Sequence, residues 1–288
     1  MNGSSSALSD LSWLVDAGAD EALLDEPVNR FQAKPTQTAA PMRGNDPATH
    51  APASRPIPTR PLPQKTQAPA ATTNRGTDGD PIGEAMALAA GCSTLAELKA
   101  ALESFEGSPL RKSATNTVFA DGVPDYGIMF IGEAPGRDED RMGLPFVGRA
   151  GKLLDRMLAA IHLDRKSNAY ITNVANWRPP DNREPTPEEA AINLPFLRRH
   201  VELVNPGVIV LLGATAARHV MGKTDGIMRL RGKWLEYHVN GRMVPVMPTL
   251  HPAYLLRQPS HKKFAWHDLQ LIEEKIMELG LLNAAIRN

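Results

Sequence analysis

From about residue 82 onward, the hydrophobic positions alternate between a pattern typical of buried strands and one typical of amphipathic helices. Short, mostly apolar segments, each the length of one buried strand, lie at 128–131, 170–174, 208–212 and 244–247. Between them, apolar residues recur three and four positions apart, as on one face of a helix. This alternation predicts an α/β fold of three layers, α/β/α, in which helices cover both faces of a central, mostly parallel four-stranded sheet.

Several of the predicted helices have recognisable limits. Helices are expected to begin after Thr94 and Thr186, because each threonine is followed three residues later by a glutamate, which is the pattern of a capping box. A proline directly after Thr186 is typical of a first helical position. Helical spacing also predicts a helix over 153–161 and a final helix over about 260–279.

The first 81 residues lack this alternation. Eleven prolines lie between Glu26 and Pro81, so residues 26–81 bury too little apolar surface to fold and are expected to be a disordered linker. Residues 1–25 contain a short apolar cluster compatible with a helix. Two interpretations of residues 8–24 stay open: a tail that packs loosely on the body, or a docking peptide for a protein partner. The folded domain is expected to span residues 82–288.

Composition and charge exclude several classes of protein. The chain has 32 Lys plus Arg and 32 Asp plus Glu, so it is not a histone-like polycation, although a local basic groove is compatible with this balance. Its single cysteine, Cys92, excludes an internal disulfide framework. The apolar runs are far shorter than the roughly 20 residues that span a bilayer, and the N-terminus lacks signal-peptide features. We therefore expect an intracellular, cytoplasmic protein without a membrane partner.

Polar residues follow three of the predicted strands, at the edge where ligands bind in α/β folds. The first strand runs into the glycine-rich turn 132–136, whose backbone N–H groups suit an anion or a polar ring edge. The second strand ends at Asn173, whose amide offers a donor and an acceptor side by side, and the fourth ends near His251. Each feature also has a plain structural interpretation, as a chain reversal, a cap or a packed histidine. Together they predict one polar site.

Five motifs at this edge resemble, in order and spacing, those of the family-four uracil-DNA glycosylases. They are Gly-Glu-Ala-Pro-Gly at 132–136, Pro-Phe-Val-Gly at 145–148, Ile-Thr-Asn at 171–173, Arg-Pro-Pro-Asp-Asn-Arg at 178–183 and His-Pro-Ala-Tyr-Leu-Leu-Arg at 251–257. The resemblance covers roughly residues 84–275. It implies a uracil-DNA glycosylase-like fold and an enzyme that flips its target nucleotide out of the duplex into a pocket.

The resemblance also implies how the base is held and released. Phe146 is expected to stack on the uracil ring, Asn173 to hydrogen-bond its polar edge, and backbone groups at Ala134 to bind a carbonyl oxygen. His251 is expected to stabilise the negative charge that develops on uracil O2, in the manner of an oxyanion-hole donor.

Three further residues are candidates for positioning the attacking water or steadying the cationic sugar. They are Glu133, Glu139 and Asn182, of which Glu133 is expected to matter most because it lies inside the glycine turn. The bland alternatives are a helix-start carboxylate for Glu139 and an Asx turn for Asn182.

DNA contacts are expected from loops near the same edge. Basic side chains there would contact phosphates, and a leucine would wedge into the base stack. The candidates for DNA binding are Arg229, Arg231, Lys233, Leu255, Leu256 and Arg257, with Lys262 and Lys263 beside them. Solvated surface charge is the alternative for the basic residues.

The chain departs from the family in one respect. Family-four enzymes typically hold a [4Fe–4S] cluster on four cysteines, but Phe105, Ser108, Trp177 and Asn193 stand at the corresponding positions here. These side chains cannot provide thiolate ligands. We therefore expect no metal and no iron–sulfur cofactor, and apolar packing around Phe105 and Trp177 in its place.

The expected function is that of a monofunctional, monomeric DNA-repair hydrolase that cleaves the N-glycosidic bond of uracil in bacterial DNA. One alternative is a catalytically weak or covalent uracil-DNA binder of the same fold; covalent relatives carry a basic, His-containing insertion after the second motif, where only residues 178–186 stand here. A second alternative, a nucleotide-binding α/β domain, lacks the Walker lysine after Gly136.

Overall fold

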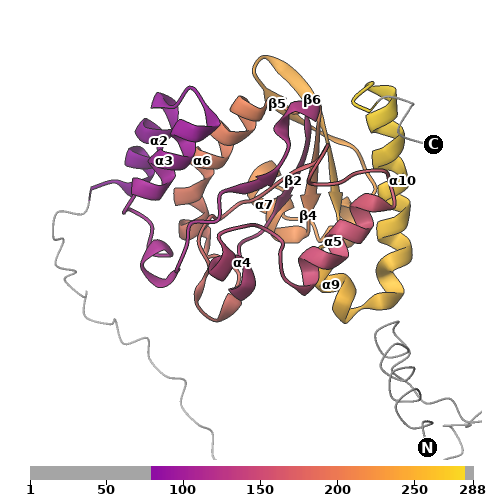
Figure 1. Cartoon of the computed structure of the whole chain (residues 1–288), viewed down its shortest axis with the longest axis horizontal. Coiled ribbons are helices and arrows are strands. Elements are labelled where there is room, and N and C mark those ends of the chain that lie inside the picture. The colour runs from indigo at the N-terminus through magenta and orange to yellow at the C-terminus, as the bar shows by residue number, and fades with distance from the viewer. Residues whose placement is uncertain (1–78, 283–288) are drawn as a thin grey trace, which may run out of the picture. The chain divides into compact units, whose positions relative to one another are not determined.

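The computed structural model describes residues 79–282. The predicted N-terminal segment 1–25, the partner-binding residues 8–24 and nearly all of the predicted linker lie outside this range. Within it, the helices alternate with strands as expected (Figure 1). The strands are β1 (Ala120–Gly122), β2 (Ile128–Gly132), β3 (Tyr170–Asn173), β4 (Val208–Leu212), β5 (Leu235–Val239) and β6 (Arg242–Thr249).

The helices within the described residues include both of those predicted from a threonine cap. They are α2 (Pro81–Gly91), α3 (Leu95–Ser104), α4 (Arg137–Met142), α5 (Arg149–Ala159), α6 (Pro187–Val204), α7 (Ala214–Met221), α8 (Ile227–Leu230), α9 (Pro252–Arg257) and α10 (Lys262–Glu278). Thr94 caps α3 and Thr186 caps α6, each by accepting a hydrogen bond from the glutamate amide three residues later. In α6 the Glu189 carboxylate in turn accepts a hydrogen bond from the Thr186 amide at 2.8 Å, which completes a capping box.

A six-stranded sheet forms the centre of the fold, in the order β1-β3-β2-β4-β6-β5. The four predicted strands are confirmed and pair in parallel as β3-β2-β4-β6. The predicted number of strands was too low, because β1 and β5 add antiparallel edges beside β3 and β6. The sheet is therefore mixed but mostly parallel, and its parallel strands end at one common edge.

Helices cover both faces of the sheet, which gives the predicted α/β/α layers (Figure 1). On one face, α5, α9 and α10 pack on a buried cluster that includes Phe130, Val210 and Met247. On the other face, α6 and α7 pack on Met129 and Ile209.

An outer layer of helices lies beyond the second face. There α2 and α3 pack against α6 around an apolar cluster, defined here as the α2–α3–α6 layer. Its largest fully buried side chains are Phe105, Trp177 and Phe196. Within the described residues α2 is the first helix, and the Asp80 side chain caps it by accepting a hydrogen bond from the Ile82 amide.

No helix among residues 79–282 is long and apolar enough to cross a membrane.

Candidate active site

The register of the sheet brings two of the predicted loops together. Gly132 at the end of β2 pairs with Asn173 at the end of β3, side by side in parallel strands. A methyl group added at Gly132 would lie 2.4 Å from the Asn173 Oδ1 and 2.5 Å from the Phe146 ring. Only glycine leaves room for both side chains at this point, so the glycine turn, Asn173 and Phe146 form one compact site.

Asn173 has a buried acceptor without a partner. The residue is 2% exposed, yet its Oδ1 accepts no hydrogen bond from the described residues. Buried polar atoms in folded proteins are nearly always satisfied, and an unsatisfied one costs about 1–3 kcal/mol. An orphan acceptor at the end of a strand is therefore a feature that a ligand with an N–H donor would complete.

Phe146 is held in a strained backbone conformation. Its φ is 53°, a left-handed value that bulky residues rarely adopt, and its ring is 5% exposed. The ring lies 5.6 Å from the His251 ring, centroid to centroid, at an interplanar angle of 35°. The loop thus presents an aromatic face beside the predicted catalytic histidine.

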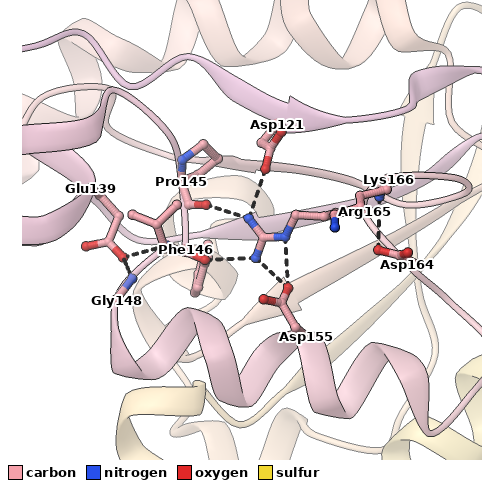
Figure 2. A network of polar contacts seen from close by, with 10 residues as sticks. Asp121, Glu139, Pro145, Phe146, Gly148, Asp155, Asp164, Arg165 and Lys166 are labelled. Carbon is pink, nitrogen blue, oxygen red and sulfur yellow. Dashed lines mark hydrogen bonds and ion pairs between the residues drawn. The ribbon is translucent and has the colours of Figure 1, made fainter.

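An arginine from a distant turn maintains this strain. The Arg165 guanidinium donates to the carbonyl oxygens of Pro145 and Phe146 at 2.9 and 2.8 Å, and it also pairs with Asp121 and Asp155 (Figure 2). Its side chain is 11% exposed, so these charged hydrogen bonds are largely shielded from water. No sequence motif pointed to Arg165, because its partners are 10 to 44 residues away.

Glu139 holds the same loop from its other side. One carboxylate oxygen, Oε1, accepts from the amides of Val147 and Gly148, both at 2.9 Å (Figure 2). The other, Oε2, accepts from the Gly136 amide at 3.1 Å. The carboxylate therefore ties the glycine turn to the Phe146 loop. This geometry matches the helix-start alternative for Glu139; its predicted part in positioning water stays a prediction.

His251 is fixed in one tautomer. Its Nδ1 accepts a hydrogen bond from the Ala253 amide at 3.1 Å, which caps α9, so the proton of the neutral ring is on Nε2. Burial, together with the positive charge of Arg257, lowers the pKa of His251 to about 4. At neutral pH the ring is therefore an uncharged donor through Nε2–H.

Glu133 lies in the glycine turn with a partly buried carboxylate. Burial raises its pKa above 4.5, and a hydrogen bond from Thr215 opposes part of that rise. The Thr215 hydroxyl also lies 3.0 Å from the Glu184 carboxylate, which pairs with Arg218. The sequence did not predict Thr215, Glu184 or Arg218 as part of the site, because no local motif contains them.

A cavity of about 290 Å³ joins three of the four predicted catalytic residues, all except Glu139. Its lining includes Glu133, Ala134, Asn182, His251 and Arg257. Asn182 reaches it from a short turn in which Asp181 and Asn182 both have positive φ values, 55° and 54°. Its Oδ1 accepts from the Arg178 side chain at 2.7 Å. The predicted part of Asn182 in positioning water stays a prediction. Phe146 and Asn173 lie next to this cavity through Gly132 and His251.

The predicted DNA-binding residues differ in how available they are. Arg229, Lys233 and Arg257 are exposed. Arg231, in contrast, pairs with the fully buried Asp268 and donates to the Phe264 carbonyl, which gives it a structural role; its phosphate contact stays a prediction.

The two leucines of the 251–257 motif also differ. Leu255 is 1% exposed and belongs to the core under α5 and α10, whereas Leu256 is partly exposed. Of the two, Leu256 is the one available to a DNA base stack; insertion of a leucine between bases stays a prediction.

The four positions at which the resemblance places cluster cysteines are all buried in or beside the α2–α3–α6 layer. Phe105 and Trp177 lie 6.4 Å apart, centroid to centroid, and Trp177 donates to Thr117 at 3.0 Å. Asn193 donates to the Glu189 carbonyl at 2.8 Å, and Ser108 is fully buried. These side chains supply no thiolate, and the described residues contain no group of three or more His, Cys, Asp or Glu arranged to hold a metal. They do not fit an iron–sulfur cluster.

Comparison with known proteins points to one family. A sequence profile of the Uracil DNA glycosylase superfamily matches residues 119–270. The Type-4 uracil-DNA glycosylase of Thermotoga maritima is 46% identical over 175 residues, covering 60% of this chain and 89% of that protein. The protein of the same name from Archaeoglobus fulgidus is 45% identical over 169 residues, covering 57% of this chain and 84% of that protein. The matched region contains every residue of the site described above.

Proposed function

The chain belongs to the uracil-DNA glycosylase superfamily, and we propose that it is a monofunctional uracil-DNA glycosylase. It releases uracil from DNA and leaves an abasic site. We further propose that it acts as a monomer in the cytoplasm and that residues 8–24 bind a protein partner. The single observation that carries the proposal is the orphan Oδ1 of Asn173 at the base of the site.

Uracil supplies the donor that this oxygen lacks. The N3–H of uracil donates to the Asn173 Oδ1, and the Nδ2 of the same amide donates to uracil O4. Cytosine has an acceptor at N3 and a donor at its exocyclic amine, so it opposes the amide at both positions. Phe146 stacks on the ring, and backbone N–H groups near Ala134 bind a carbonyl oxygen.

His251 assists the departure of the base. When the bond between C1′ and N1 breaks, its electron pair moves into uracil, and negative charge collects on O2. The Nε2–H of neutral His251 donates to that oxygen. A donor placed where charge develops contributes about 100- to 1000-fold to the rate. The positive charge left on the sugar is taken up by water.

Glu133 is the base that we assign to this water. Its raised pKa makes the carboxylate a better proton acceptor than an ordinary glutamate, and it lines the same cavity as His251. The water oxygen bonds to C1′ and its proton passes to Glu133. Asn182 positions the water from the opposite loop, and Glu139 keeps the Phe146 loop in place through its three backbone hydrogen bonds.

Phosphate contacts come from the exposed basic residues of the edge. We assign them to Arg229, Lys233 and Arg257, with Leu256 as the residue that fills the space left by the flipped base. Arg231 is left out of this set because its guanidinium is committed to Asp268. The interaction should weaken with salt, as all phosphate contacts do.

We propose that the protein works without an iron–sulfur cluster. The packing of Phe105 and Trp177 supports this, because it occupies positions where the family has ligands. Side chains, backbone groups and water are sufficient for the proposed binding and release of uracil. Treatment with a chelator should therefore leave uracil release unchanged.

The test is incubation of metal-analysed protein with an end-labelled oligonucleotide that carries one uracil, followed by alkaline cleavage. Scission at the uracil is the expected result, with none at a cytosine in the same position. Uracil-dependent retention without scission would favour the binding-protein alternative. If the oligonucleotide is neither cut at the uracil nor retained by the protein, the proposal is refuted. Iron in the purified monomeric protein would refute the cluster-free part of the proposal.

A further inference from the structure

A second recess lies beside the proposed site, between α5, α9 and α10. Its volume is about 280 Å³, and its floor is apolar, formed by Leu153, Met157 and Leu255. Trp266 forms one wall and is 45% exposed, although tryptophan side chains are on average highly buried. We name this recess the Trp266 groove.

The charge around the groove has one sign. Arg156 and Lys262 line it, both exposed, and no acidic residue does. Neither cation forms an ion pair with another of the described residues, and Asp155 next to Arg156 is already paired with Arg165. The groove therefore combines an exposed aromatic ring with two uncommitted positive charges.

The groove shares a helix with the proposed active site. His251, Ala253 and Arg257 of the α9 motif line the catalytic cavity, whereas Leu255 of the same helix lines the Trp266 groove. In Figure 1, α9 and the first turns of α10 lie at the edge of the sheet where α4 also begins. The catalytic cavity and the Trp266 groove are therefore both lined by residues of this one short helix and its cap.

We propose that the Trp266 groove is a stacking subsite for an unpaired base of single-stranded DNA, with Arg156 and Lys262 on the flanking phosphates. This inference rests on the proposed function and adds a substrate class to it. Aromatic rings that stack bases beside a basic track are how proteins hold single strands without reading sequence, because every base has a π-face. A base paired in a duplex has no face free for such a contact. The protein therefore favours single strands over duplexes.

The test measures binding of fluorescently labelled oligothymidylate, which contains no uracil, by fluorescence anisotropy of the full chain. Trp266→Ala should raise the Kd by about 10-fold or more, and Trp266→Phe should retain most of the affinity. Tyr126→Ala is the matched control, because Tyr126 is an aromatic residue of 42% exposure that precedes β2, at the opposite edge of the sheet. Lys262→Ala should lower the slope of log Kd against log salt by about 0.7.

The two proposals can fail separately. If Trp266→Ala binds oligothymidylate as tightly as the unaltered protein, the groove proposal is overturned, whatever the uracil assay shows. If the unaltered protein releases no uracil but its binding depends on Trp266, the function fails and the groove stands. A dimer in sedimentation that Trp266→Ala abolishes would assign the groove to a second copy and also overturn the proposal.

Discussion

The carboxyl edge of the sheet and the α2–α3–α6 layer are held together by opposite means. At the edge, charged and polar groups fix the loops: Arg165 and Glu139 bind backbone around Phe146, and Asn173 keeps an unpaired acceptor. In the α2–α3–α6 layer, Phe105, Trp177 and Phe196 pack together, with ring centroids 5.2 Å apart for Phe105 and Phe196.

This difference indicates that the carboxyl edge of the sheet serves catalysis and the α2–α3–α6 layer serves stability. Polar networks place donors and acceptors to within tenths of an ångström, at the expense of strain such as the positive φ of Phe146. Apolar packing stabilises without such precision, and it can occupy positions where relatives of this family would have metal ligands. Damage to the layer should therefore reduce stability, and damage to the edge should reduce the rate.

The largest expected effect is on stability, from Trp177→Ala in the α2–α3–α6 layer. Removing a fully buried tryptophan should lower the free energy of unfolding by about 3–5 kcal/mol, because it leaves a cavity among packed rings. Urea denaturation measures this loss. The rate of uracil release per folded molecule should change little. Trp177→Phe, which keeps a ring, should lose less; equal losses would argue against ring packing as the cause.

The next effect is on the rate, from His251→Ala at the edge. Loss of the Nε2–H donor should slow single-turnover uracil release about 100- to 1000-fold while DNA binding survives. His251→Asn is the matched control, since an asparagine oxygen can still cap α9 but places no donor at uracil O2. Both variants should be slow. A fast His251→Asn would assign the histidine to capping alone.

A smaller effect should follow from Arg165→Lys. Lysine keeps the charge but cannot reach two carbonyls and two carboxylates at once, so the Phe146 loop should loosen and uracil release should fall about 10-fold. Arg199→Lys in α6 is the counterpart in the other region, because Arg199 donates to the Cys92 carbonyl and pairs with Glu202. It should lower the melting temperature without slowing uracil release. If Arg199→Lys slowed uracil release, the distinction between an edge that sets the rate and a layer that sets stability would be wrong.

The smallest effects are those of pH. Burial lowers the pKa of His200 to about 3 and that of His251 to about 4, both below the ordinary 6.5. The unfolded chain therefore binds more protons than the folded chain as pH falls below 6.5. Each histidine should cost about 1 kcal/mol of stability between pH 7 and pH 5.5. Urea denaturation at both pH values, of the unaltered protein and of His251→Asn, measures the part of this loss of stability that is due to His251. Uracil release should decline on the same acid side, as Glu133 gains its proton.

The strands that the sequence predicted are those in mostly apolar segments, and the structure shows why the other two were missed. Leu235–Val239 alternates between partly buried and exposed residues up to the buried Val239, as an edge strand does, and Ala120–Gly122 has no large apolar side chain. Both are strands because a neighbour pairs with them. Helix starts at Thr94 and Thr186 were foreseen because caps are local.

The residues of the site likewise divide into those that local motifs predict and those that only the fold brings together. Asn173 and His251 stand in short motifs at strand ends, and Phe146 stands in the motif between α4 and α5, so the sequence motifs could predict one site before any coordinates were known. Arg165 acts on the Phe146 loop from about 20 residues away, and the Thr215 and Glu184 groups behind Glu133 come from two other elements. Contacts of this kind depend on the completed fold, and no pattern in the chain announces them.

The most direct test of the account is Asn173→Asp, assayed on otherwise identical oligonucleotides that carry uracil or cytosine. A buried aspartic acid that keeps its proton can donate to cytosine N3, and an ionised one opposes the uracil carbonyl O4. We predict that uracil release falls about 100-fold and that cytosine release becomes measurable. Unchanged uracil release, with cytosine still untouched, would contradict the claim that the orphan amide at the edge of the sheet reads the base.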